Sequence, residues 1–164
     1  MNIKDKTTRQ IVGYFLLLLL ITFVYIINSS KEQDRQFVIE QEKYNVAVQD
    51  IQGGEYDQAL SLLEEVDQTN TKSVPVKYYI GVAHFYKEDF DKAAQEFSNL
   101  LDINPYMVKD SEFMLLFAHT LINANQFDEA SIVLERCKNL QTPENMPDYQ
   151  DQVNQLIKQI TVSS

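Results

Sequence analysis

The sequence that decides the fold is a stretch that recurs three times along the chain. It reads KEDFDKAAQEFSNLL at Lys87–Leu101. Related stretches lie on both sides of it, GGEYDQALSLLEEV at Gly53–Val66 and NANQFDEASIVLERC at Asn123–Cys137. When the copies are aligned, they follow one another after 34 and then 37 residues. A unit that recurs at a nearly constant interval predicts an array of structural repeats.

Each copy carries an alanine that is followed four residues later by a bulky apolar residue. This spacing places a small and a large side chain on one face of a helix, where a second helix can approach closely. The three pairs are Ala59 with Leu63, Ala93 with Phe97, and Ala130 with Leu134. A further stretch with apolar spacings of three and four precedes each copy. Short turns join the two stretches at Gly53-Gly54, Glu88-Asp89 and Asn125-Gln126. Each copy is therefore predicted to be a pair of helices.

This arrangement resembles the tetratricopeptide repeat (TPR) family, over residues 40–144. The three predicted repeats are 40–73, 74–107 and 111–144. The second matches best, with Ile80-Gly81, Ala93, Phe97 and Pro105 at family positions. The chain departs from the family at the tryptophan position, which holds Lys43, Lys77 and Met114, and it keeps the turn glycine only as Gly54. The resemblance implies an all-α helical solenoid, and it says little about function.

Segments on both sides of the repeats complete the predicted organisation. The C-terminal segment 145–164 is predicted to form a capping helix, because its apolar residues share one stripe and TPR arrays commonly end in such a helix. That stripe consists of Tyr149, Val153, Leu156, Ile157 and Ile160. Residues 29–39 are predicted to be a helical linker. Together with an N-terminal helix, the fold class is an all-α solenoid of three TPR-like repeats with a C-terminal cap.

The N-terminal helix is predicted from the uncharged run IVGYFLLLLLITFVYII at Ile11–Ile27. This length is just enough to cross a hydrocarbon core, so we expect a transmembrane helix at 11–28 after a short basic tail at 1–10. A cleaved signal peptide is the alternative, because basic residues precede the run. No small-residue cleavage site follows it, which favours the uncleaved anchor.

The charges around this run set the predicted localisation. Lys4, Lys6 and Arg9 precede it, and Lys31, Arg35 and Lys43 follow it, so that only the amino terminus tips the count. We expect a single-pass membrane protein of the bacterial inner membrane, with the N-terminus in the cytoplasm and the TPR domain in the periplasm. The alternative is a cytosolic domain, as in mitochondrial outer-membrane import receptors, which also join an N-terminal anchor to TPR helices.

Composition and the lack of catalytic motifs argue against several classes of function. The formal net charge of -10 argues against nucleic acid as a partner. One cysteine excludes an intramolecular disulfide and a cysteine-based zinc site. The sequence has no phosphate-binding loop, dinucleotide fingerprint, serine-hydrolase elbow or zinc-protease motif. We therefore predict a protein that is not an enzyme, with no catalytic residue, metal or cofactor. His84 and Cys137 are predicted to be packed core side chains.

The resemblance implies a partner-binding groove lined by the first helix of each repeat. Some TPR domains hold a partner's C-terminal carboxylate with Lys, Arg and Asn, but this groove has no Lys or Arg at those positions. Its tyrosines and aliphatic residues suit an amphipathic helix or an extended apolar peptide of a protein partner. In the alternative, the C-terminal helix fills the groove and partners bind the convex acidic side. The groove residues are Tyr44, Asn45, Val48, Tyr78, Val82, Phe85, Tyr86, Glu112, Leu115, His119, Ile122 and Asn123.

Three functions fit this sequence. The preferred one is a membrane-anchored scaffold that recruits a partner protein into a membrane or cell-envelope complex, because the domain is small and the groove short. The first alternative is a chaperone-like holder of translocated or unfolded chains near a translocon. The second alternative is a self-assembling structural subunit, which would form a homo-oligomer. The scaffold predicts one stoichiometric partner, whereas the holder predicts many clients.

Overall fold

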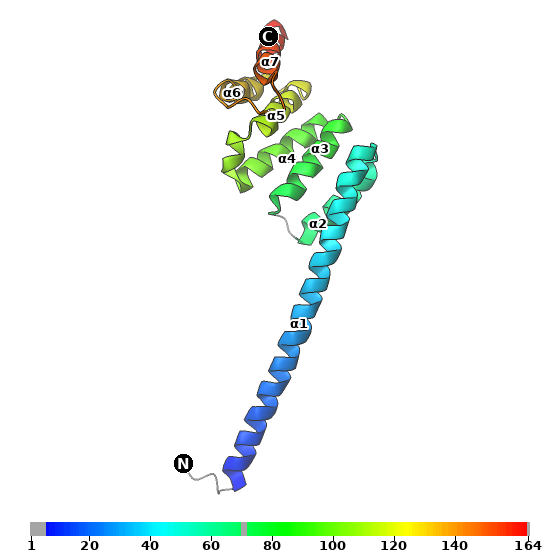
Figure 1. The fold of residues 1–164 in the computed structure, drawn as a ribbon, viewed down its shortest axis with the longest axis vertical. Coiled ribbons are helices and arrows are strands. Elements are labelled where there is room, and N and C mark those ends of the chain that lie inside the picture. Colours follow the sequence, from blue (N-terminus) through cyan, green and yellow to red (C-terminus); the bar gives the residue numbers. More distant parts are fainter. Residues whose placement is uncertain (1–5, 70–71, 164) are drawn as a thin grey trace. The chain divides into compact units, whose positions relative to one another are not determined.

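The computed structural model describes residues 6–69 and 72–163, with side chains at 10–23, 25, 35–69 and 72–161. All regular structure in this part of the chain is helical (Figure 1). The predicted all-α class is therefore confirmed. The chain divides into two compact units, Met1–Glu42 and Lys43–Ser164, and the long first helix runs through both. The elements are α1 (Lys6–Gly53), α2 (Tyr56–Thr69), α3 (Val74–Tyr86), α4 (Phe90–Ile103), the 3-10 helix η1 (Pro105–Lys109), α5 (Ser111–Asn123), α6 (Phe127–Cys137) and α7 (Tyr149–Ser163).

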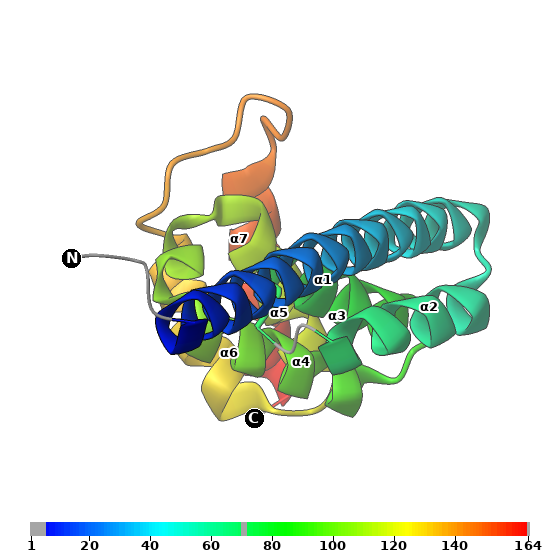
Figure 2. The same cartoon turned by 90° about the horizontal axis from the view of Figure 1, so that it is seen from below.

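The second unit is a linear stack of helices. In Figures 1 and 2, α2 packs on α3, α3 on α4, α4 on α5 and α5 on α6, and α7 then packs against both α6 and α5. Each helix therefore contacts its near neighbours in the sequence, which is the contact pattern of a solenoid. The pairs α3/α4 and α5/α6 lie inside the predicted repeats 74–107 and 111–144. The repeat bounds themselves stay a prediction.

The three turns between paired helices share one backbone geometry. Gly54, Glu88 and Asn125 have positive φ values of 83°, 63° and 58°. In each turn the next amide donates to a carbonyl five residues back, as in the 2.9 Å bond from Asp89 N to His84 O. This pairing satisfies carbonyls that a helix end leaves free. Glycine adopts such a backbone without strain and asparagine tolerates it, whereas glutamate is the costly choice.

The core follows the small-and-large pairing of the repeats. Where the second repeat has Gly81, the first and third have Ala47 and Ala118, and all three are buried. A Cβ on Gly81 would lie only 2.6 Å from Cδ1 of Phe97. The Phe97 ring cannot move away easily, because it packs against Phe113 at a centroid distance of 5.6 Å and against other buried rings. Glycine is therefore required where its partner is phenylalanine.

A half-buried ion cluster joins three helices of the second unit. Lys77 Nζ on α3 lies 2.8 Å from Asp67 Oδ2 on α2 and 3.4 Å from Glu96 Oε2 on α4. Burial lowers the pKa of Lys77, but the hydrogen bond to Asp67 and the charges of Glu96 and Asp67 outweigh it, so the net pKa is raised. The side chains are 14–21% exposed. Lys77 occupies the position of the family's tryptophan and fills it with a charged contact instead.

The first unit corrects the membrane prediction. Within the described residues, no helix combines the length and the apolar content needed to cross a membrane. The side chains of residues 24 and 26–28 of the predicted span, and those of residues 1–9 of the predicted tail, lie outside the described part of the chain.

Two predictions change with this finding. The transmembrane helix at 11–28 is not supported, because no helix among the described residues is long and apolar enough to span a membrane. The localisation built on that helix, a single-pass protein of the bacterial inner membrane with a periplasmic domain, is corrected for the same reason.

Candidate protein-binding surfaces

The predicted groove residues lie on the last turns of α1 and on α3 and α5, and they differ in exposure. Val82, Leu115 and Ile122 are buried, so they support the surface instead of forming it. The burial of Leu115 and Ile122 is understandable, since α5 is contacted by α4, α6 and α7. The others are partly or fully exposed, namely Tyr44, Asn45, Val48, Tyr78, Phe85, Tyr86, Glu112, His119 and Asn123. Their role in partner binding stays a prediction.

Aromatic rings connect the first helices of successive repeats. Tyr44 on α1 contacts Tyr79 on α3 edge-on at 5.7 Å, and Tyr79 contacts Tyr78 at 5.2 Å. Tyr78 in turn lies 6.3 Å from Phe113 on α5. Ring contacts of this kind add stability beyond their buried area, typically about 0.5–1.5 kcal/mol per pair. The result is a connected line of rings that ends at the buried Phe113, and its partly exposed members, Tyr44, Tyr78 and Tyr79, are called the aromatic face below.

The aromatic face extends toward the turns through Tyr86. Its ring stacks on Tyr56 of α2, with centroids 5.5 Å apart and planes within 8°, and it contacts Phe85 at 5.6 Å. Tyr86 nevertheless stays 56% exposed. A large, partly exposed ring that is held in place by two neighbours loses little conformational freedom when a partner covers it. Tyr86 is therefore the most accessible anchor of the aromatic face.

The electrostatics of the aromatic face are neutral to acidic. Burial raises the pKa of Tyr78, and the charges of Tyr79, Asp110 and Glu112 add to the effect. Burial, with a smaller contribution from Tyr79, likewise raises the pKa of Tyr44. Both hydroxyls therefore keep their protons at neutral pH and can donate hydrogen bonds. Burial lowers the pKa of His119, which favours the uncharged imidazole.

Helix α7 covers the end of the third repeat. Tyr149, Val153, Leu156 and Ile160 are buried, and the Tyr149 hydroxyl donates a 3.2 Å hydrogen bond to the carbonyl oxygen of Cys137 on α6. The apolar stripe predicted at 145–164 is thus turned toward α5 and α6, the helices against which α7 packs. Without this helix, the last repeat would expose its apolar side to water.

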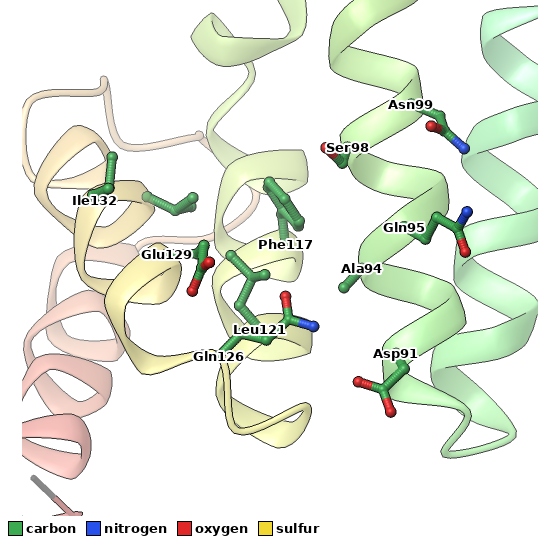
Figure 3. Close-up of a pocket in the computed structure, with 11 residues that line it drawn as sticks. Asp91, Ala94, Gln95, Ser98, Asn99, Phe117, Leu121, Gln126, Glu129 and Ile132 are labelled. Carbon is green, nitrogen blue, oxygen red and sulfur yellow. The ribbon is translucent and has the colours of Figure 1, made fainter.

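A second surface, absent from the sequence-based site, lies among α4, α5 and α6. It is a groove of about 510 Å³. Figure 3 shows α4 on one side, α6 on the other, and Phe117 and Leu121 of α5 between them. The remaining lining residues are Asp91, Ala94, Gln95, Ser98, Asn99, Gln126, Glu129, Ile132 and Val133. It is called the α4/α6 groove below.

One sequence signal could have indicated this groove. Ile132 falls between the core positions Ala130, Val133 and Leu134 of its helix, yet it is 73% exposed. An aliphatic residue outside the buried stripe of an amphipathic helix is a common mark of a contact surface. Its neighbours in the groove come from two other helices, so the sequence alone could not assemble them.

Comparison with known proteins agrees with this architecture. Residues 84–156 match the family model described as tetratricopeptide repeat. No curated protein sequence is significantly similar to the chain. Several solved structures are similar in fold. The type III secretion translocator chaperone SycD of Yersinia enterocolitica aligns with a TM-score of 0.64 at 16% identity, covering 75% of this chain and 83% of that one.

Two similar structures hold peptides. SycD in complex with a peptide of the translocator YopD aligns with a TM-score of 0.61 at 17% identity, over 75% of this chain and 92% of that chain. The first TPR of Spaghetti (RPAP3) bound to the HSP90 peptide SRMEEVD has a TM-score of 0.62 at 13% identity, over 77% and 97%. At these identities the likeness concerns the fold. Repeat pattern, helical fold and family match together support the tetratricopeptide-repeat family for this chain, and its second unit has a TPR-like solenoid fold.

Proposed function

We propose that this chain is a non-catalytic, chaperone-like holder that binds an apolar or amphipathic segment of a partner protein on its aromatic face. The observation that carries the proposal is the connected set of rings Tyr44, Tyr79 and Tyr78, together with the exposed Tyr86. Tyrosine buries a large area with few rotatable bonds, which favours it at such contacts. The fold likeness to SycD, both free and with a YopD peptide, supports a holder over a membrane scaffold.

The chemistry of the aromatic face also limits the partner. The predicted groove positions contain no Lys or Arg, so a peptide that depends on a bound carboxylate lacks its counter-charge. Apolar side chains of the partner would instead supply most of the binding energy by leaving water, at about 25 cal/mol per Å². We therefore expect clients that are selected by apolar content, and not by an acidic C-terminus.

A dedicated adaptor for one partner is the second candidate. It is favoured by the likeness to the first TPR of RPAP3, which is bound to a defined HSP90 peptide. Holder and adaptor would use the same aromatic face, and they differ in how many proteins bind there. The number of partners therefore decides between them.

Photo-crosslinking in cells counts those partners. The crosslinking amino acid p-benzoylphenylalanine is placed at position 86 of the full chain, where the side chain is 56% exposed. The same substitution at the exposed position 64 on α2 serves as the control. Many adducts at position 86, identified by mass spectrometry, would support the holder, and a single adduct would support the adaptor. Adducts at position 64 alone would contradict both.

A solution assay tests the holder directly. The full chain should suppress aggregation of a chemically denatured reporter enzyme, measured by light scattering. The double variant Tyr44→Ser, Tyr86→Ser should suppress it several-fold less. Tyr106→Ser is a matched control, because Tyr106 is 74% exposed on η1, outside the aromatic face. If the double variant and the control both equal the original chain, the aromatic face is not the client site.

A further inference from the structure

We infer that the α4/α6 groove is a second docking site, which takes a short basic and aliphatic segment of a partner protein. Its floor is apolar. Phe117 and Leu121 of α5, together with Ala94 of α4 and Val133 of α6, are buried and line it. Figure 3 shows the α5 side chains between the two outer helices. The volume of about 510 Å³ lies within the roughly 300–1,000 Å³ range of ligand sites.

An exposed aliphatic side chain borders this floor. Ile132 is 73% exposed, more than any other aliphatic side chain with a described position in residues 43–164. Single exposed aliphatic residues are ordinary on protein surfaces, but this one continues an apolar floor. A partner's aliphatic side chain that entered the groove would contact Ile132 and Val133 on one wall and Ala94 on the other. That contact would remove apolar area of both proteins from water.

The charged residues of the groove determine which sign of charge a partner should carry. Its lining residues include two carboxylates, Asp91 and Glu129, and neither Lys nor Arg. Each lies in the first turn of its helix, Asp91 on α4 and Glu129 on α6. In the described part of the chain neither takes part in an ion pair. Charge complementarity therefore favours a partner with Lys or Arg and disfavours an acidic one.

The lining also provides polar contacts along the rim. Gln95, Ser98 and Asn99 follow Asp91 along α4, and Gln126 precedes α6 (Figure 3). Amide and hydroxyl groups of this kind can pair with the backbone of a bound peptide. An apolar floor, a polar rim and two carboxylates match a peptide whose aliphatic anchors are flanked by basic residues. They do not match nucleic acid, whose phosphates the carboxylates would repel.

This site is independent of the aromatic face. The walls of the α4/α6 groove are α4 and α6, the second helices of repeats two and three, and its floor is Phe117 and Leu121 of α5, whereas the exposed rings of the aromatic face lie on α1 and α3. The two surfaces share no lining residue. The inference therefore does not rest on the proposed function, and variants of one surface leave the other intact.

Binding of defined peptides to the full chain tests the inference. The probe is a fluorescein-labelled peptide, GKAIRKLIG, with blocked ends, and its affinity is read by fluorescence anisotropy. The controls are GEAIEELIG, which reverses the charges, and GKASRKSSG, which removes the aliphatic anchors. We expect the probe to bind and both controls to bind at least tenfold more weakly. Equal binding of the acidic control would overturn the inference.

Matched variants locate the binding. The double variant Asp91→Asn, Glu129→Gln keeps the shape of both side chains and removes their charges. It should lower the affinity for the probe roughly three- to tenfold, which is the range expected for exposed charge pairs. Ile132→Ser should weaken it by a similar factor. Asp151→Asn, an exposed carboxylate in the first turn of α7, should leave the affinity unchanged. Unchanged affinity in both groove variants would exclude this site.

A crosslink separates failure of this site from failure of the aromatic face. p-Benzoylphenylalanine is placed at position 98, an exposed position of the groove, and in a second protein at position 86 of the aromatic face. An adduct of GKAIRKLIG at position 98 supports the inference. An adduct at position 86 alone would place the probe on the aromatic face and overturn the inference, while the proposed function would stand.

Discussion

The second and third repeats reach the same packing with different side chains. The second pairs Gly81 with Phe97, and the third pairs Ala118 with Leu134 at the matching positions. At the position of the family's tryptophan, the second has the ion-paired Lys77 and the third has the buried Met114. The residue that fits a given repeat position therefore depends on the residue that it contacts. The effect of a substitution on stability depends on that contact too.

The largest effect is expected from moving the third repeat's alanine into the second. Gly81→Ala should destabilise the fold by about 2–3 kcal/mol, because the new methyl group meets the fixed Phe97 ring. Adding Phe97→Leu should recover at least half of that loss. The converse change, Ala118→Gly, should cost only about 1 kcal/mol from helix propensity. Urea unfolding followed by circular dichroism measures all four proteins, and a double variant that recovers none of the loss would contradict the pairing.

The next largest effect concerns the ion cluster. Lys77→Met copies the residue of the third repeat and should cost about 1–2 kcal/mol, because Asp67 and Glu96 then face each other without a cation. The loss is smaller than for a fully buried pair, since water still reaches these side chains.

The control for that change removes the stranded charges. The triple variant Lys77→Met, Asp67→Leu, Glu96→Leu should regain the stability of the original chain or exceed it. Lys43→Met, which breaks the more exposed pair with Glu65, should change stability by less than about 1 kcal/mol. Equal losses for Lys43→Met and Lys77→Met in urea unfolding would show that burial of the cluster is unimportant.

A smaller effect, of opposite sign, is expected at the turns. Glu88→Gly should stabilise the chain by about 0.5–1 kcal/mol, since glutamate is strained at a φ of 63°. Asn125→Gly should gain less, because asparagine tolerates this conformation. Gly54→Ala should lose stability. Thermal unfolding of the three variants measures the order, and a loss on Glu88→Gly would contradict the strain.

The smallest effect is a pH dependence of stability, to which His84 of the second repeat contributes. Its buried His84 replaces the Leu121 of the third repeat, and burial lowers its pKa against the opposing contact with Asp89. A lowered pKa means that the unfolded chain binds the proton first. Stability from this group is therefore present above about pH 6.5 and is lost as the pH falls through the folded-state pKa.

The variant His84→Leu tests that sign. It should flatten the stability profile between pH 7 and pH 5 in urea unfolding. The pKa of His119 is also lowered by burial, so the remaining slope should shrink in His84→Leu, His119→Leu. A profile that stays unchanged in both variants would show that neither histidine is responsible.

Local sequence signals predicted much of the fold. The paired helices and the three turns follow from spacings within a few residues, and Gly54, Glu88 and Asn125 all have the expected turn backbone. The sequence predicted less about the features that depend on packing between helices. The repeat spacing does not predict the 3-10 helix η1, whose start is capped by Asn104 through a 3.2 Å hydrogen bond from Tyr106 N. The sequence cannot show how far α5 is covered by its neighbours, so Leu115 and Ile122 looked accessible.

The single cysteine gives this protein a built-in kinetic reporter. Cys137 is fully buried, and burial raises the pKa of its thiol although the contact with Tyr149 opposes this. A thiol reagent in solution therefore reacts only after this end of the solenoid opens, because the thiolate must form and be reached. The labelling rate of the unmodified chain reports how often this end of the solenoid opens, separately from global unfolding. A ligand that slows the labelling must stabilise the last helices, and one that leaves the rate unchanged must act elsewhere.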